Sequence, residues 1–253
     1  MPEVKKIALV TGGSRGLGRS TVEALARRGV SSIFTYHTNE AAADAVVASV
    51  ERIGARAEGL QLDTGDAHTF SFFANQIQRV LGEWGAERFD YLINMAGTSH
   101  SGLFGEVTEE DLDAAYRIHV KGPFFLTQEL LPLIADGGRI VNISSGLTRF
   151  YYPGRIAYAS MKGAVEVMTR YMAKELGPRG IAVNTVAPGA IQTDFSGGVV
   201  RDNPDVARHI AEMTALGRPG LPDDIGPMIA SLLSEDNRWV NAQRIEVSGG
   251  QTI

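Results

Sequence analysis

The stretch IALVTGGSRGLG, residues 7–18, decides the fold of this chain. An apolar run suited to a buried strand, Lys6–Thr11, leads directly into a glycine-rich turn that opens a helical segment. Glycine tolerates positive φ and lets the backbone approach a ligand closely, while a helix N-terminus presents free N–H groups to a pyrophosphate. This order of elements predicts a dinucleotide-binding unit, and a tight turn that holds no ligand is the alternative.

Apolar runs suited to buried strands alternate with helix-period segments along the rest of the chain. After Lys6–Thr11 the expected strands are Ser31–Tyr36, Gly59–Asp63, Asp90–Ala96, Arg139–Ser144, Ile181–Ala187 and Gln243–Val247. This alternation implies right-handed strand–helix–strand units, and so an α/β fold with one doubly wound parallel sheet and helices on both faces. Because no repeat or linker-like change of composition interrupts it, we expect residues 1–253 to form a single domain.

Two segments between the strands carry further predictions. Thr108 and Asp111 form a potential capping box at the start of a helix that should run to about Ile134 and bend at Gly122-Pro123, because proline has no N–H to donate. Residues 191–216 combine a Gly-, Ser-, Asp- and Asn-rich part with a helical stretch, Asp205–Leu216. Such a segment could cover a ligand at the carboxyl ends of the strands as a lid, and an ordinary surface loop is the alternative.

Composition and charge exclude several classes of protein. With 44% hydrophobic and 21% charged residues the chain is expected to fold as a globular protein. Its net charge is −5 without a Lys/Arg cluster, no segment approaches the ~20 apolar residues that span a bilayer, and no His/Asp/Glu group has metal-ligand spacing. We therefore expect no nucleic-acid partner, no membrane association and no metal. The absence of cysteine and of a secretory signal in MPEVKKIALV favours a cytoplasmic protein.

The stretch Tyr158-Ala159-Ser160-Met161-Lys162 carries the strongest chemical signal. It lies in an expected helix, Ala157–Leu176, and a spacing of four residues puts Tyr158 and Lys162 on one face about one turn apart. A free tyrosine has a pKa near ~10, and a neighbouring ammonium group favours the phenolate and lowers that pKa. The pair predicts a proton donor and acceptor tuned toward working pH, as hydride transfer to a carbonyl requires.

Taken together, these motifs resemble the short-chain dehydrogenase/reductase family over nearly the whole chain. The resemblance rests on the T-G-x-x-x-G-x-G turn, on Tyr-x-x-x-Lys with Ser145 thirteen residues before Tyr158, on Asn94-Met95-Ala96-Gly97 in place of N-N-A-G, and on Pro188-Gly189. It implies a Rossmann-like domain and an NAD(P)-dependent oxidoreductase. Such an enzyme transfers a hydride between a nicotinamide and a small-molecule carbonyl or alcohol substrate.

The resemblance also implies catalytic roles. Ser145 would orient the substrate carbonyl, Tyr158 would act as the acid/base, and Lys162 would tune Tyr158 and hold the nicotinamide ribose. His119 stands where relatives carry an asparagine that supports a water chain to the lysine. An imidazole can donate and accept through its two nitrogens, so His119 is a candidate substitute in this relay. The alternative is an interior histidine that takes no part in it.

Cofactor binding is expected at residues that follow the strands, most of them carried over by the resemblance. They are Gly12, Ser14, Arg15, Gly16, Leu17, Gly18, Tyr36, Asp63, Thr64, Asn94, Ala96, Gly97, Tyr158, Lys162, Pro188, Gly189, Ile191 and Thr193. Tyr36 occupies the place where a carboxylate would hold the ribose of NAD, and Arg15 suits a 2′-phosphate, so NADP(H) is favoured. His37, where NADP-dependent relatives often carry a second arginine, keeps NAD(H) open. Asp63 resembles the family's adenine-pocket aspartate, with a helix cap near Thr64–Asp66 as the alternative.

Predictions about the substrate and the oligomeric state come from the loops at the carboxyl edge of the sheet and from the resemblance. The loops Thr98–Phe104, Leu147–Ile156 and Phe195–Met213 should contact the substrate, and Arg149 in the second could bind an anion. A 3-oxoacyl-thioester reductase is one candidate activity, and a sugar, polyol or xenobiotic alcohol dehydrogenase is the alternative. A catalytically silent dinucleotide-sensing protein is a competing class, encouraged only by His119. The C-terminal part resembles tetrameric relatives, which implies a homotetramer or homodimer.

Overall fold

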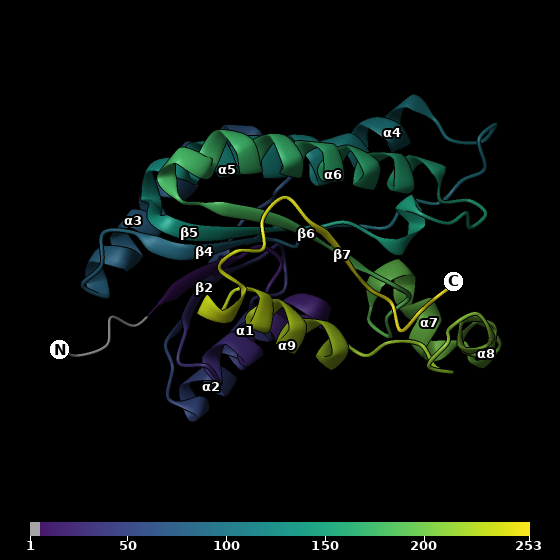
Figure 1. Ribbon diagram of the computed structural model, residues 1–253, viewed down its shortest axis with the longest axis horizontal. Coiled ribbons are helices and arrows are strands. Elements are labelled where there is room, and N and C mark those ends of the chain that lie inside the picture. Colours follow the sequence, from purple (N-terminus) through teal and green to yellow (C-terminus); the bar gives the residue numbers. More distant parts are fainter. Residues whose placement is uncertain (1–5) are drawn as a thin grey trace.

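A single parallel sheet organises the chain, as Figure 1 shows for the computed structural model, which describes residues 6–253. Residues 1–5, which belong to the expected domain and to the MPEVKKIALV segment, lie outside the described residues. The strand order is β3-β2-β1-β4-β5-β6-β7. The strands are β1 Ile7–Val10, β2 Ser31–Tyr36, β3 Ala57–Gln61, β4 Phe89–Asn94, β5 Ile134–Ile143, β6 Ala182–Pro188 and β7 Arg244–Val247. The predicted α/β fold with a doubly wound, Rossmann-like sheet is confirmed.

Helices cover both faces of this sheet. In chain order they are α1 Gly16–Ala26, α2 Glu40–Ile53, α3 Phe70–Glu83, α4 Glu109–Tyr116, α5 Gly122–Leu130, α6 Ile156–Leu176, α7 Val199–Asp202, α8 Pro204–Glu212 and α9 Pro222–Leu232. Helices α1, α2 and α9 pack on one face, and α3, α5 and α6 pack on the other (Figure 1). None of the helices within residues 6–253 has the length and apolar character needed to cross a bilayer.

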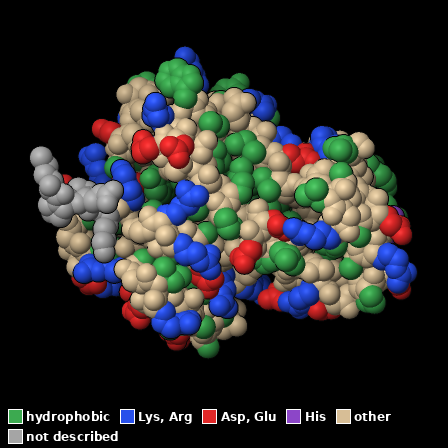
Figure 2. Space-filling view, turned by 60° about the horizontal axis from the view of Figure 1, so that its bottom comes forward, with side chains coloured by type: hydrophobic (Ala, Val, Ile, Leu, Met, Phe, Trp, Pro, Cys, Tyr) green, Lys and Arg blue, Asp and Glu red, His purple; other side chains and the backbone are tan. Residues whose placement is uncertain are grey.

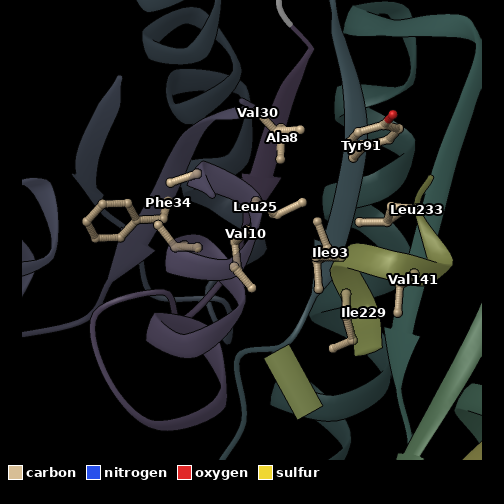
Figure 3. Close-up of a cluster of buried hydrophobic side chains, with 14 of the residues drawn as sticks. Ala8, Val10, Leu25, Val30, Phe34, Tyr91, Ile93, Val141, Ile229 and Leu233 are labelled. Carbon is tan, nitrogen blue, oxygen red and sulfur yellow. The ribbon is translucent and has the colours of Figure 1, made fainter. Parts of the chain in front are cut away.

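Strand β1 is a continuous apolar run because both of its faces are buried. Successive side chains point to opposite sides of a strand, so Ala8 and Val10 of β1 enter one core while Ile7 and Leu9 enter the other. Figure 3 shows the first core, in which Leu25 of α1 and Ile229 of α9 lie over the strands. Burial of this kind stabilises a fold by roughly 25 cal/mol per Å² of apolar surface.

The helix expected from Thr108 to about Ile134 is divided. The capping box forms, with Thr108 and Asp111 bonding each other's backbone N–H groups. After α4 the chain makes a π-helical turn, Arg117–Lys121, before α5 begins, and Ile134 already belongs to β5. Pro123 cannot donate to the carbonyl of residue 119, so the regular ladder fails there and the turn widens. The bend therefore precedes Pro123, and it places His119 in the widened turn.

Residues 191–216 leave the sheet after β6 and form a separate excursion made of α7 and α8 (Figure 1). The predicted helix Asp205–Leu216 is shorter in the structure, where α8 is capped by the Asn203 side chain and ends at Glu212. Beyond it, the backbone of Ala215 and Leu216 donates to the carbonyls of Gly250 and Gly249. The C-terminal end of the 191–216 segment is therefore hydrogen-bonded to the residues that follow β7.

Candidate active site

The carboxyl ends of β1, β4, β5 and β6 open into one cavity of about 550 Å³. In an open parallel sheet this edge, near the point where the strand order reverses, is where ligands bind. Every predicted site residue except Asn94 lines the cavity, and so do residues from all three expected substrate loops. On the face shown in Figure 2, basic and acidic side chains are interspersed.

The glycine-rich turn after β1 forms a tight cradle at one end of the cavity. Gly12 has a φ of +69°, and its N–H donates to Thr35 Oγ1 over 3.0 Å. A Cβ on Gly18 would lie only 2.0 Å from the carbonyl oxygen of Gly12, so only glycine fits there. No side chain caps the start of α1 at Arg15, which leaves the first N–H groups of the helix for a ligand. This cradle fits the pyrophosphate of a dinucleotide.

Arg15, Tyr36, His37, Asp63 and Thr64 line the same end of the cavity. The side chain of Asp63 accepts from the N–H of Gly65 over 2.8 Å and lies 3.8 Å from His37 Nε2. The short helix after β3 is capped by Asp66 and not by Asp63. Asp63 therefore shapes the turn and at the same time lines the cavity.

The segment after β6 forms the opposite wall. Pro188, Gly189, Ile191 and Thr193 all line the cavity, and a Cβ on Gly16 would lie 3.4 Å from Thr193 Cγ2. The glycine-rich turn and the residues after β6 thus meet across the cavity. The N–H of Ala190 donates to Gln251 Oε1 over 2.9 Å. Gln251 is buried and lines the cavity, but it follows β7, so no local pattern in the sequence could indicate this contact.

Ser145, Tyr158 and Lys162 come together in the middle of the cavity. Ser145 follows β5, and its side chain is close enough to the hydroxyl of Tyr158, in the first turn of α6, to lower the pKa of the tyrosine. Lys162 lies one turn further along α6, and its Nζ donates to the carbonyl of Ile143 over 2.8 Å. That nitrogen is 5.5 Å from the centre of the Tyr158 ring. The three predicted groups are therefore adjacent.

Burial is the main cause of the pKa shifts of Tyr158 and Lys162. Desolvation raises the pKa of Tyr158 to about 12, although the hydrogen bond with Ser145 and the charge of Arg155 oppose the shift. Desolvation also lowers the pKa of Lys162 to about 7. The expected lowering of the Tyr158 pKa toward working pH is therefore wrong for this cavity, because burial disfavours the charged form of both groups and outweighs the other influences. At neutral pH Tyr158 keeps its proton and can donate it.

His119 is buried beside Tyr158, with ring centres 5.1 Å apart in an edge-to-face arrangement. Its Nε2 lies 2.8 Å from the carbonyl oxygen of Thr98, which can only accept, so Nε2 carries the hydrogen. Burial and the nearby charge of Lys162 lower the pKa of His119 to about 2, which keeps the ring neutral. Nδ1 is therefore an acceptor, and within residues 6–253 it has no partner. His119 is an interior histidine that also touches the reactive cluster.

Asn94, predicted as a cofactor contact, does not line the cavity. Its amide nitrogen donates to Thr127 Oγ1 over 3.0 Å and to Asn142 Oδ1 over 2.8 Å. Asn142 donates in turn to Thr169 Oγ1 over 2.9 Å, and Thr185 donates to that same oxygen over 2.8 Å. This buried polar chain joins α5, β4, β5, α6 and β6 beneath the cavity. The prediction failed because the side chain of Asn94 points into the protein and not beyond the strand end.

Arg149, predicted to meet an anionic substrate, also lies outside the cavity. It donates to both carboxylate oxygens of Glu246 over 2.8 and 2.6 Å, and to the carbonyls of Gln251 and Thr252. The loop still contributes to the cavity through other residues. Phe150, Tyr152 and Arg155 line it, while Tyr151 is 83% exposed. Sequence reasoning did not single out Arg155, although it lies in an expected substrate loop and only three residues before Tyr158.

Comparison with known proteins extends these observations over the whole chain. A family model described as enoyl-(acyl carrier protein) reductase matches residues 12–252. The short chain dehydrogenase/reductase AacuN of Aspergillus aculeatus is 33% identical over 97% of this chain and 95% of its own length. The tetrahydroxynaphthalene reductase PfmaG of Pestalotiopsis fici is 34% identical, with coverages of 98% and 92%.

A solved structure agrees with the fold. The angucycline C-6 ketoreductase LanV with bound NADP has a TM-score of 0.92 to this chain at 37% identity, and the match covers 98% of this chain and 95% of that one. The family model spans β2 to β7 and the residues that line the cavity, and the two relatives and the solved structure match 97–98% of the chain. The chain belongs to the short-chain dehydrogenase/reductase family of oxidoreductases.

Proposed function

We propose that this chain is an NADPH-dependent ketoreductase that reduces a carbonyl group on a fused-ring aromatic substrate. The observation that carries the proposal is the position of Ser145, Tyr158 and Lys162 against an apolar wall. That wall consists of Leu147, Phe150, Tyr152, Phe195, Val199, Val200, Val206 and Ile210. The ring of Phe195 lies 5.8 Å from that of Tyr158, so a flat substrate would meet aromatic surface on entering.

Bound at the glycine-rich cradle, the nicotinamide cofactor supplies the hydride. The N–H groups at the start of α1 would hold its pyrophosphate, and Gly189, Ile191 and Thr193 would hold its nicotinamide. Ser145 and Tyr158 would bind the substrate oxygen through their hydroxyls. The Tyr158 proton then passes from Oη to that oxygen, and the Lys162 ammonium, stabilised by the Ile143 carbonyl, favours the phenolate left behind. A tyrosine that is protonated at neutral pH suits the reductive direction.

Two observations support NADPH over NADH. Arg15 is exposed at the mouth of the cradle, and the end of β2 presents Tyr36 and no carboxylate. LanV, which matches this chain over nearly its whole length, was solved with NADP. Together these features favour a cofactor with a 2′-phosphate, which Arg15 can hold by two parallel N–H bonds.

Replacing Arg15 with alanine should lower the preference for NADPH by about 10- to 100-fold, because a hydrogen bond to a charged group contributes roughly 1.5–3 kcal/mol. Most of the change should appear as a higher KM for NADPH, with the KM for NADH nearly unchanged. Steady-state rates with both cofactors measure it. An Arg15→Ala enzyme that keeps the wild-type ratio of kcat/KM values would remove Arg15 from the 2′-phosphate site.

The substrate class follows from the apolar wall. A sugar or polyol would leave hydroxyl groups unpaired against these side chains, which costs free energy. A 3-oxoacyl thioester, the other activity that the sequence suggested, needs no aromatic surface beside its carbonyl. The name of PfmaG identifies a reductase of tetrahydroxynaphthalene, and LanV is named as a ketoreductase of angucyclines. These names support a fused-ring ketone as the substrate class of this chain.

The direct test is NADPH oxidation by purified protein with 1-tetralone, a fused-ring ketone, and with an acetoacetyl thioester in parallel. We expect kcat/KM for the tetralone to exceed that for the thioester by about tenfold or more, since each buried CH₂ contributes roughly 0.8 kcal/mol. A thioester reduced faster than any fused-ring ketone would replace this substrate class with the acyl one. Without turnover of either carbonyl, the proposed ketoreductase activity would be refuted.

The whole chain is proposed to act as one catalytic domain in the cytoplasm, with residues 191–216 as its substrate lid. We also propose that it assembles as a homotetramer or homodimer. Apolar side chains support this, because several on α4, α5 and α6 are exposed although large. They are Leu112, Tyr116, Phe124, Val167 and Tyr171. An exposed group of this kind is typical of an interface between protein chains.

A further inference from the structure

We propose that Arg155 is a substrate-specificity residue that binds an anionic oxygen, a carboxylate or a phenolate, about one ring away from the carbonyl that is reduced. This inference rests on the proposed ketoreductase function and narrows its substrate to anionic fused-ring ketones. It depends on three features of Arg155: how its side chain is held, what charge surrounds it, and where it lies relative to Tyr158.

The guanidinium of Arg155 is held at the edge of the cavity by the loop after β4. Its Nη1 donates to Ser99 Oγ over 3.1 Å and to Ser101 Oγ over 2.8 Å. The backbone is fixed as well, because Arg155 forms a β-bridge with Gly102 and precedes the first turn of α6. A guanidinium has five N–H donors in a planar fork. Because the two serines fix Nη1, the remaining N–H donors of the guanidinium are oriented before a ligand binds.

The positive charge of Arg155 has no acidic partner among the described residues. Among residues 6–253, no carboxylate oxygen lies within 4.0 Å of its guanidinium. Two acidic residues line the cavity: Asp63 belongs to the adenosine end, and Asp194 is paired with Arg201. Arg149 and Arg244, by contrast, both pair with Glu246. A half-buried cation that faces a cavity without a counter-charge is a site for an anionic ligand.

The position of Arg155 sets the distance between the anion and the reacting group. Arg155 is the N-cap of α6, and its charge is close enough to Tyr158 to lower the pKa of the tyrosine. Arg155 precedes Tyr158 by three residues, and both line the cavity. If the carbonyl oxygen meets Tyr158, the opposite side of the same ring or the adjacent fused ring reaches Arg155. Apolar residues of the proposed lid line the same cavity, and a low effective dielectric in it would strengthen the ionic contact.

The kinetic test compares 1-tetralone-6-carboxylate with its methyl ester in the wild-type enzyme and in Arg155→Gln and Arg155→Lys. The readout is the ratio of kcat/KM for the acid to that for the ester, in which any effect of Arg155 on the chemical step cancels. We expect the wild type to favour the acid, and Arg155→Gln to lower the ratio by about 10- to 100-fold. Arg155→Lys should fall in between, because lysine keeps the charge but loses the fork.

A matched control removes a positive charge elsewhere. Arg79 on α3 does not line the cavity and pairs with Glu83, so Arg79→Gln should leave the acid-to-ester ratio unchanged. If Arg79→Gln lowers the ratio as much as Arg155→Gln does, the effect is a general one of net charge and the proposal is wrong. The proposal is also wrong if the wild type shows no preference for the acid.

A binding measurement separates this inference from the proposed reaction. Calorimetry with 2-naphthoate and 2-naphthamide, in the presence of saturating NADP⁺, needs no turnover. We expect naphthoate to bind the wild type at least tenfold more tightly than the amide, and Arg155→Gln to abolish the difference. If no tetralone is reduced but this difference is found, the ketoreductase proposal fails and the anion site stands. If tetralones are reduced while naphthoate and naphthamide bind alike, the anion site fails alone.

Discussion

Replacing Tyr158 with phenylalanine is expected to lower kcat for ketone reduction by about 10²- to 10⁴-fold, the usual contribution of a positioned acid/base. The substitution removes only the hydroxyl, so the ring should keep its edge-to-face contact with His119 and its place in the first turn of α6. NADPH binding should change by no more than a few-fold, because the glycine-rich cradle is untouched. Single-turnover rates and fluorescence titration with NADPH measure the two quantities separately.

Tyr171 provides the matched control on the same helix. It is 68% exposed and lies far from the cavity, so Tyr171→Phe removes an identical hydroxyl where no chemistry is expected. We expect its kcat to stay within about twofold of the wild type. A Tyr158→Phe enzyme with the wild-type rate would show that another group donates the proton. The buried His119 could not be that group in its acidic form, since a pKa of about 2 leaves it neutral at working pH.

A second large effect is expected when Gly18 is replaced by alanine. The new Cβ would lie 2.0 Å from the carbonyl oxygen of Gly12 and 2.8 Å from its carbonyl carbon. Real Cβ atoms do not approach backbone this closely, so the turn must open and α1 must move away from β1. The backbone N–H groups that hold the pyrophosphate would then lose their alignment. We expect NADPH affinity to fall by about 100-fold or more, equivalent to the loss of one or two charged hydrogen bonds.

Gly82 provides the control for this substitution. It lies in α3, is exposed, and has open space where a Cβ would be added. Gly82→Ala should raise the free energy of unfolding by up to about 1 kcal/mol, because alanine favours the helix, and should leave NADPH binding unchanged. Thermal unfolding and NADPH titration of both variants check these expectations. If Gly18→Ala binds NADPH as the wild type does, the glycine-rich turn is not the pyrophosphate site.

Much of the fold was predictable because it depends on local periodicity. All seven expected strands occur, and β2 has the bounds that were predicted for it. Strand β5 begins at Ile134, five residues early, because its pairing with β4 contains an irregularity between Phe89 and Tyr91 that no single segment reveals.

The site was predictable only where a residue type and its spacing act together. Ser145, Tyr158 and Lys162 are brought together by one strand and the helix that follows it, so their spacing carried the information. The protonation of Tyr158 and Lys162 depends on burial by many residues and was predicted wrongly for Tyr158. Arg149 was misassigned because its partner, Glu246, lies almost a hundred residues away in the sequence. Contacts between residues this far apart in the sequence can be identified only in the folded structure.

The buried polar chain from Thr127 through Asn94, Asn142 and Thr169 to Thr185 has a consequence for how this sequence can diverge. Each member supplies the partner of the next, so replacing one alone leaves a buried donor or acceptor unmatched, at roughly 1–3 kcal/mol. Replacing the whole set by apolar residues of similar shape carries a much smaller penalty. These five positions should therefore be inherited as a group. Homologues that have lost one of them should have lost its neighbours too.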